Sequence, residues 1–193
     1  MEVVSLEIED VKLVKPRIFP DDRGFFSQTY HYEQYRDEGI DVCFVQDNWS
    51  RSTQGVLRGL HYQLKSAQDK LVSVVRGEVF DVAVDIRRGS PTFGKWVGAV
   101  LSEENHHQLF VPKGFAHGFC VLSDEVDFVY KCSDFYAPSD EYALRWDDPQ
   151  IGIHWPSGNF SVSEKDQRAP LLKEIPAENL PTYEDYKNDN NSN

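Results

Sequence analysis

The chain has 193 residues, of which 40% are hydrophobic and 13% aromatic, and this suits one domain with a sizeable core. Its formal net charge is −12 at pH 7, which argues against nucleic acid and against an anionic membrane surface as partners. An anionic small molecule would need a local cluster of basic side chains. Because no apolar stretch is long enough to span a bilayer, we expect no membrane contact.

The cysteines point to a reducing compartment. Cys43, Cys120 and Cys132 are an odd number, and none of them forms a C-x-x-C pair. This usage is typical of reduced thiols in a cytoplasmic protein. The first residues lack a basic segment followed by an apolar one, so we expect no signal peptide.

Short segments rich in β-branched and aromatic residues recur along the chain, separated by Gly, Pro and Asp, as is typical of strands. In chain order, we expect strands at residues 6–19 (broken at Pro16), 25–30, 42–48, 71–76, 79–86, 96–101, 108–112, 118–122, 126–132 and 143–146. One short helix is predicted at residues 32–38, ended by Gly39. Such spacing indicates an all-β sandwich or barrel, here a single domain over residues 1–186 with a polar tail at 187–193.

Residues 55–63 place Arg58 and His61 beside apolar neighbours. A guanidinium matches phosphate geometry, and an imidazole is easily tuned as a base near neutral pH. On a strand, His61 and Gln63 would share one face, which is how a barrel lines its interior. A single histidine in such surroundings is more often structural, so His61 by itself does not establish catalysis.

A second histidine, His117, follows a turn built from Pro and Gly, and the turn would aim its ring. Asp81 or Asp85 lies on the polar face of the strand expected at 79–86. Because an acid on an otherwise apolar sheet needs a partner, either one could orient a histidine. His106, in a polar run, is expected in a solvated turn.

Three further residues have ordinary structural interpretations when each is taken alone. Tyr130 resembles a packing tyrosine of a strand, and Lys70 an exposed loop lysine. Asp166 is the fourth residue of a capping-box pattern that begins at Ser163 and predicts a helix start.

A metal site is not expected. Zinc or iron needs two or three histidines and a carboxylate in one shell. Gln63 occupies the position where an H-x-H pair would have its second histidine, and His117 supplies at most one ligand. A complete ligand set is therefore missing.

A series of motifs runs in order over residues 5–173. The motifs lie at residues 23–26, 46–50, 55–61, 81–87, 90–94, 112–119, 130–132, 148–149, 153–156 and 163–166. Residues 112–117 also resemble the second cupin motif, and the first cupin motif survives only as His61-x-Gln63. The ordered set resembles the dTDP-4-dehydrorhamnose 3,5-epimerase family, the RmlC-like sugar epimerases of the cupin superfamily.

The resemblance implies an all-β, double-stranded β-helix (a cupin-like jelly roll) with a few short peripheral helices. It implies a cytoplasmic homodimer that needs no metal and no cofactor. The implied reaction is epimerisation of dTDP-4-dehydro-6-deoxy-D-glucose at C3 and C5 to dTDP-4-dehydro-L-rhamnose, the precursor of dTDP-L-rhamnose for cell-surface glycans.

The resemblance also implies roles for single residues. The chemistry is expected from His61 as general base, Asp166 as its orienting acid, Tyr130 as the acid on the opposite sugar face, and Lys70 at the oxyanion. Substrate binding is expected from Arg58, Gln46 and Asn48 at the diphosphate, from Arg23, Phe26 and Gln28 of the partner subunit at the nucleotide, and from Asp81, His117, Tyr136 and Lys165. Many relatives carry Glu at the position of Gln28, a departure that bears on nucleotide preference.

The residue types suit this chemistry. A proton α to the C4 ketone can be removed because the charge spreads onto oxygen, where a cation such as Lys70 can meet it. Inversion needs a proton from the other face, so the base and the acid must be different groups. Tyrosine, with an unperturbed pKa of about 10, stays protonated and ready to donate.

Three alternatives stay open at this point. The first is a mono-epimerase that acts at C3 or C5 only on a related nucleotide-linked 4-ketosugar. The second is a non-catalytic sugar-binding cupin, against which the combination of His61, Lys70, Tyr130 and Asp166 counts. The third is a metal-dependent cupin oxygenase.

Overall fold

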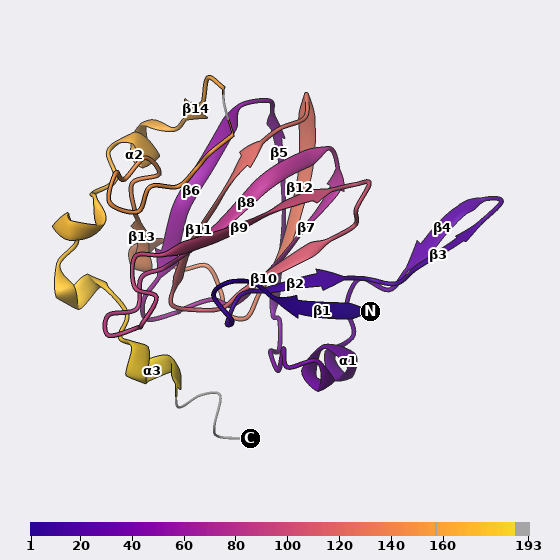
Figure 1. Cartoon of the computed structure of the whole chain (residues 1–193), viewed down its shortest axis with the longest axis horizontal. Helices are drawn as coiled ribbons and strands as arrows, with labels where there is room; N and C mark the ends of the chain where they lie inside the picture. Colours follow the sequence, from indigo (N-terminus) through magenta and orange to yellow (C-terminus); the bar gives the residue numbers. More distant parts are fainter. Residues whose placement is uncertain (157, 188–193) are drawn as a thin grey trace.

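The structure, a computed structural model, describes residues 1–156 and 158–187, so nearly all of the tail expected at 187–193 lies outside it. Most strands form two sheets (Figure 1). The first sheet has the order β1 (Glu2–Ser5), β2 (Lys12–Lys15), β10 (Gln108–Val111), β7 (Lys70–Arg76), β12 (Glu125–Cys132) and β5 (Gln46–Thr53). The second has the order β13 (Glu141–Ala143), β6 (Val56–Gln63), β11 (Phe115–Val121), β8 (Glu78–Asp85) and β9 (Trp96–Ser102).

The two sheets pack face to face. The sequence of β8 suits a strand with neighbours on both sides in the second sheet. Val79 and Ala83 point into the core between the sheets, and both are fully buried. Val82 and Val84 point to the outer face, where they join a second buried cluster. Burying one such valine contributes about 1.5–3 kcal/mol. The expected jelly roll is therefore confirmed.

The outer face of the second sheet is covered by the C-terminal part of the chain (Figure 1). A short strand, β14 (Ser161–Val162), runs parallel to β6, and α2 (Glu164–Gln167) follows it. The remaining C-terminal elements are η2 (Leu172–Glu174), η3 (Ala177–Asn179) and α3 (Tyr183–Lys187). Because β14 pairs with β6, the chain returns after more than a hundred residues to the strand that carries His61.

Two glycines allow β6 and β11 to approach each other closely. Gly59 has φ +122°, and a Cβ there would lie 2.6 Å from the Cα of Gly118. The pairing of the two strands shifts register next to this contact, between His117 and Phe119. On one side of the shift His61 pairs directly with His117, so the two rings belong to neighbouring positions on the same face of the sheet.

The strand predictions are correct in kind, with displaced boundaries. The strand expected at 42–48 begins only at Gln46, because Val42 and Phe44 leave the sheet to pack beside Tyr35. Tyr35 belongs to α1 (Tyr32–Asp37), the helix expected at 32–38. The strand expected at 118–122 begins at Phe115, since the preceding turn ends at Gly114 with φ +87°. One strand, β1, precedes the region where the first strand was expected.

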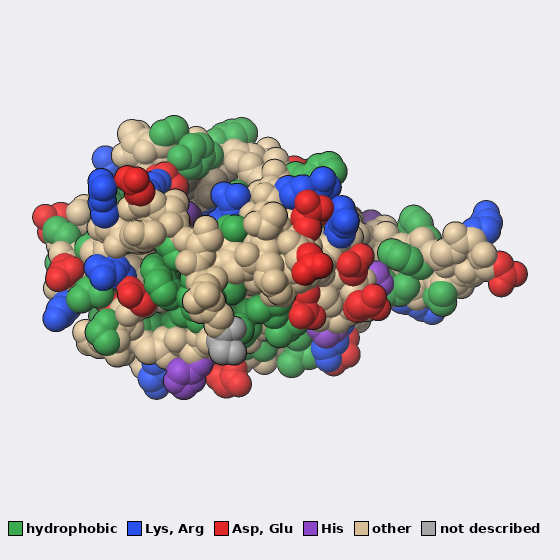
Figure 2. All heavy atoms as spheres, turned by 90° about the horizontal axis from the view of Figure 1, so that it is seen from above, with side chains coloured by type: hydrophobic (Ala, Val, Ile, Leu, Met, Phe, Trp, Pro, Cys, Tyr) green, Lys and Arg blue, Asp and Glu red, His purple; other side chains and the backbone are tan. Residues whose placement is uncertain are grey.

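A two-stranded hairpin extends away from the body of the molecule (Figure 1). It consists of β3 (Ile18–Asp21) and β4 (Gly24–Ser27), joined by a turn at Asp22 and Arg23. We call residues 18–27 the arm. Phe25 and Phe26 on the arm are 60% and 67% exposed, and hydrophobic side chains are visible along it in Figure 2.

The described residues include no helix long and apolar enough to cross a membrane. Cys43, Cys120 and Cys132 all have free thiols, as expected.

Candidate active site

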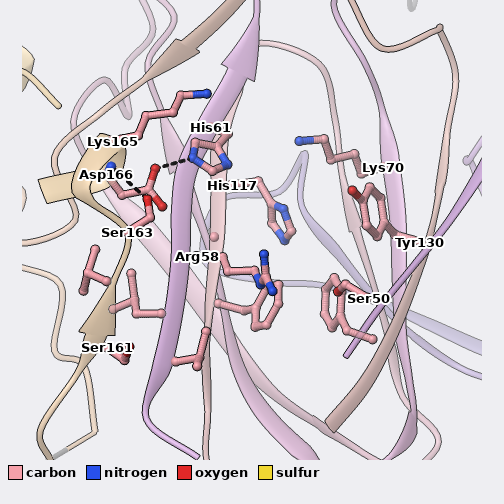
Figure 3. Close-up of a pocket in the computed structure, with 16 residues that line it drawn as sticks. Ser50, Arg58, His61, Lys70, His117, Tyr130, Ser161, Ser163, Lys165 and Asp166 are labelled. Carbon is pink, nitrogen blue, oxygen red and sulfur yellow. Dashed lines mark hydrogen bonds and ion pairs between the residues drawn. The ribbon is translucent and has the colours of Figure 1, made fainter. Parts of the chain in front are cut away.

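A cavity of about 490 Å³ opens between the two sheets beside α2 (Figure 3). Its lining includes the four residues expected to carry the chemistry, namely His61, Lys70, Tyr130 and Asp166, together with Arg58, His117 and Lys165. An adjoining cavity of about 340 Å³ shares His61, Lys70 and Tyr130 with the first one. From above, Figure 2 shows the molecule hollowed at this end, with Lys or Arg side chains inside the hollow.

His61 and Asp166 form a hydrogen-bonded pair. Nε2 of His61 lies 2.6 Å from Oδ1 of Asp166, while the second ring nitrogen faces the cavity in Figure 3. The histidine side chain is 30% exposed and the carboxylate 5%, so the acid stands behind the ring. An ionised Asp166 accepts a hydrogen bond from Nε2–H, and this tautomer leaves Nδ1 unprotonated toward the cavity.

The helix start at Ser163 positions Asp166. The Ser163 hydroxyl accepts a hydrogen bond from the Asp166 backbone amide at 3.1 Å, as the capping-box pattern predicts. The carboxylate of Asp166 reaches His61, and the Ser163 side chain also hydrogen-bonds to it. Burial favours its neutral form, but the hydrogen bonds that it accepts outweigh burial and hold the pKa of Asp166 below its usual value.

Tyr130 and Lys70 lie across the cavity from His61, on the first sheet (Figure 3). Tyr130 belongs to β12 and Lys70 to the start of the neighbouring β7. Burial raises the pKa of Tyr130, which keeps the phenol protonated at neutral pH. Burial also lowers the pKa of Lys70, although nearby Asp81 opposes the shift. The structure thus places a phenol and an amine on the wall opposite His61.

His117 is held by Asp81, which decides between the two acids considered from the sequence. Nε2 of His117 lies 2.9 Å and 3.0 Å from the two carboxylate oxygens of Asp81. Asp81 is fully buried behind the ring and does not line either cavity, so it positions His117, and its expected part in substrate binding stays a prediction. Asp85 instead binds Arg87 and Ser90.

The residues expected at the diphosphate are divided between the two cavities. Arg58 lies in the larger one, and its Nε donates to the Ser52 hydroxyl at 3.0 Å. Gln46 and Asn48 line the smaller one, where the Gln46 amide donates to the Asn48 side chain at 3.0 Å. The predicted set is therefore divided between two cavities that share His61, Lys70 and Tyr130, and it is not one cluster.

The structure does not bring Arg23, Phe26 or Gln28 to the cavity of their own chain. All three are exposed, on the arm or just after it. The Arg23 side chain is 89% exposed, and its one ion pair within the described residues is with its neighbour Asp21, at 2.6 Å. This placement agrees with a role toward another molecule.

Tyr136 and Lys165 meet at a residue that the sequence did not single out. Both donate hydrogen bonds to the carboxylate of Glu141, which lines the smaller cavity with His61. Glu141 belongs to a short strand without clear alternation, so no sequence pattern marked it.

The side-chain amide of Gln63 forms its hydrogen bonds with backbone groups. Its amide nitrogen donates to the carbonyl oxygens of Ser66 and Phe135, at 2.6 Å and 3.2 Å, and its oxygen accepts from the amide of Ala137 at 2.8 Å. Within residues 1–156 and 158–187, no three His, Cys, Asp or Glu side chains converge as metal ligands. Through its hydrogen bonds to Phe135 and Ala137, Gln63 anchors the loop at residues 135–137 on the wall of the smaller cavity.

Fold and site together define a cupin-type jelly roll with an acid–base site between its sheets. The family model described as dTDP-4-dehydrorhamnose 3,5-epimerase matches residues 5–174. The chain belongs to this family, as the sequence motifs predict.

Individual relatives agree with this assignment. A dTDP-4-dehydrorhamnose 3,5-epimerase of Shigella flexneri is 56% identical over 168 residues, covering 86% of this chain and 93% of that protein. One from Neisseria gonorrhoeae is 55% identical over 172 residues, which are 89% of this chain, but this chain spans only 50% of that relative. The crystal structure of RmlC from Legionella pneumophila, in complex with dTDP-4-keto-L-rhamnose, has a TM-score of 0.92 at 54% identity and covers 94% of this chain and 98% of that one.

Proposed function

We propose that this chain epimerises dTDP-4-dehydro-6-deoxy-D-glucose at C3 and C5 to dTDP-4-dehydro-L-rhamnose, a step of dTDP-L-rhamnose synthesis for cell-surface polysaccharide. One observation carries the proposal. The His61–Asp166 pair and Tyr130 stand on opposite walls of one cavity, in the second and the first sheet respectively. Inversion of a carbon requires removal of a proton on one face and delivery on the other, and this arrangement supplies both.

His61 acts as the base. With Nε2–H donated to Asp166, the unprotonated Nδ1 takes the proton from the carbon next to the C4 ketone. The ionised carboxylate behind the ring stabilises the imidazolium that forms. Because C3 and C5 both flank the ketone, the same base can serve both carbons when the sugar reorients in the cavity.

Lys70 meets the developing enolate oxygen. A cation held where negative charge appears in the transition state lowers the barrier, and it does so more strongly where water is excluded. Tyr130 then returns a proton to the opposite face, because burial keeps its phenol protonated. His117, held by Asp81, lies between these walls and orients the sugar.

The diphosphate and the nucleotide extend from this centre. Arg58, with Gln46 and Asn48 beyond it, is proposed to bind the diphosphate. Arg23, Phe26 and Gln28 are proposed to reach the nucleotide of the partner subunit in a homodimer, which would explain an arm that leaves its own cavity. We further propose that the enzyme is cytoplasmic, where free thiols persist.

Incubation with the 4-keto nucleotide sugar in D₂O, followed by NMR, tests the function. Deuterium incorporated at both C3 and C5, with conversion to the L-rhamno product, is the expected result. Deuterium at only one carbon would identify a mono-epimerase. A folded protein that exchanges neither carbon would refute the enzymatic function and leave a sugar-binding cupin.

A further inference from the structure

Glu141 lies on the wall of the active-site cavity, and the mechanism above gives it no role. Its Oε2 accepts a hydrogen bond from the Tyr136 hydroxyl at 3.0 Å and another from the Lys165 ammonium. Tyr136 comes from the segment before η1 (Pro138–Asp140), whereas Lys165 comes from α2. One carboxylate thus connects two elements that are separate in the chain.

The position of Glu141 is set by the strand that carries the base. Within the β13–β6 pair, Glu141 stands opposite Gln63, and Ala143 stands opposite His61. Because alternate residues of a strand share a face, Glu141 points to the same side as the imidazole. Its side chain is 19% exposed, and burial favours the neutral acid. The hydrogen bonds from Lys165 and Tyr136 outweigh burial and lower the pKa of Glu141.

Asp166, the acid behind His61, depends on α2 for its position. This helix has only one turn, from Glu164 to Gln167, which is too short to be stable by its own hydrogen bonds. Asp166 directly follows Lys165. Any contact that restrains Lys165 against the barrel therefore restrains the Asp166 carboxylate as well.

We propose that Glu141 is a positioning residue, and that its link to Lys165 holds α2 against β13 so that Asp166 stays aligned with His61. The inference rests on the proposed function, because alignment matters through the proton transfer at His61. Glu141 does not itself contact the reacting carbon. It acts through Lys165 and the helix that Lys165 shares with Asp166.

The same helix provides a matched control. Arg168 and Glu164 form an ion pair at 3.3 Å, with side chains that are 80% and 84% exposed. This pair lies on α2 but reaches neither β13 nor the cavity. Loss of an exposed pair costs little, so Glu164→Gln should leave the reaction unchanged.

The experiment compares Glu141→Gln, Lys165→Met, their double variant and Glu164→Gln, by deuterium exchange at saturating nucleotide sugar. For a charged hydrogen bond, we expect each single variant to exchange about 10- to 100-fold more slowly. The double variant should be no slower than the slower single one, because both changes remove the same link. Lys165→Met should also raise KM, since Lys165 is a proposed substrate contact.

A readout without substrate keeps the two proposals separate. ¹⁵N NMR of the His61 ring should show one tautomer, protonated at Nε2, in the unaltered protein and in Glu164→Gln, but a mixture in Glu141→Gln. A single tautomer and an unaltered exchange rate in Glu141→Gln would overturn the inference, as would multiplicative effects in the double variant. If the unaltered protein exchanges no deuterium, the proposed function fails, and the tautomers alone decide the link. If Glu141→Gln fails to fold, Lys165→Met removes the same link from the solvent side.

Discussion

His61 and Asp166 are 105 positions apart in the chain, and their side chains lie 2.6 Å apart. The contact exists because the chain returns beside β6 as β14, which pairs Val162 with Leu57, and then forms α2. A carboxylate at this distance selects the ring nitrogen that carries the proton, and so selects the nitrogen that faces the cavity.

Replacing this carboxylate should disable the base while the fold persists. Asp166→Asn can still form a hydrogen bond but supplies no negative charge for the imidazolium, so we expect exchange at both carbons to fall by about 10²–10⁴-fold. His61→Ala should abolish it at both carbons. Deuterium NMR provides the rates, and near-UV circular dichroism checks the fold. Equal exchange in Asp166→Asn and the unaltered enzyme would remove Asp166 from the mechanism.

Tyr130→Phe should separate the two proton transfers. The base remains, so C–H exchange on the His61 face continues, whereas delivery of a proton to the opposite face is lost. We expect formation of the L-rhamno product to fall by about 10²-fold or more, and deuterium exchange to fall much less. Both quantities come from one NMR time course. An equal loss of both would contradict the role of Tyr130 as the acid.

Mixed dimers can show whether the arm serves the partner's site. One variant, His61→Ala, has an intact arm and an inactive site. The other, Phe26→Ala with Arg23→Ala, has an intact site and an impaired arm. We would dissociate both dimers, mix the two variants and let them reassociate. If the arm crosses to the partner, a mixed dimer should have about one active site, formed by the intact site of one chain and the intact arm of the other. If each arm serves its own chain, mixing will restore nothing.

Gln63→Leu should loosen the loop that Gln63 anchors. The change leaves the carbonyl of Phe135 and the amide of Ala137 without their partner, at a cost of about 1–3 kcal/mol for each group that stays buried. Tyr136 lies between them, so we expect a higher KM along with a lower melting temperature. We also expect fewer than one iron or zinc ion per chain in the unaltered protein and in Gln63→Leu. An unchanged KM in the destabilised variant would show that the loop does not contact substrate.

Acid should destabilise the fold through Asp85. Burial favours the neutral form, but hydrogen bonds from Arg87, Ser90 and Thr92 outweigh burial and lower the pKa of Asp85. A lowered carboxyl pKa contributes stability above the unfolded value of about 3.9, and this stability is lost as the pH falls through the folded pKa. Urea unfolding at about pH 6 and about pH 3 should therefore show a large loss in the unaltered protein and a smaller loss in Asp85→Asn.

The control for this prediction is Asp147→Asn. Asp147 pairs with Arg145 in an exposed ion pair at 2.9 Å, so its removal should change the unfolding free energy by at most about 1 kcal/mol. Asp85→Asn should cost about 3–5 kcal/mol near neutral pH, because Arg87 is buried beside it. Identical pH dependence in Asp85→Asn and the unaltered protein would refute the assignment.

Local patterns were sufficient for the strands and for several site residues. Alternation placed β8, and the Gly39 signal ended α1. These features depend on neighbours in the chain, and the sequence displays such neighbours directly. The start of β5 was misplaced because Phe44 packs against α1 instead of joining the sheet, a choice that depends on distant residues.

The sequence by itself determined the jelly-roll class, the family and the residue types of the chemistry, because periodicity and ordered motifs are local properties. The family resemblance implied that His61 is the base, but Asp81 and Asp85 were indistinguishable as partners of a histidine. Only the tertiary structure decided that Asp81 holds His117, that Gln63 anchors a loop, and that Glu141 meets Lys165. These contacts join strands and loops far apart in the chain, and their geometry arises only when the two sheets pack.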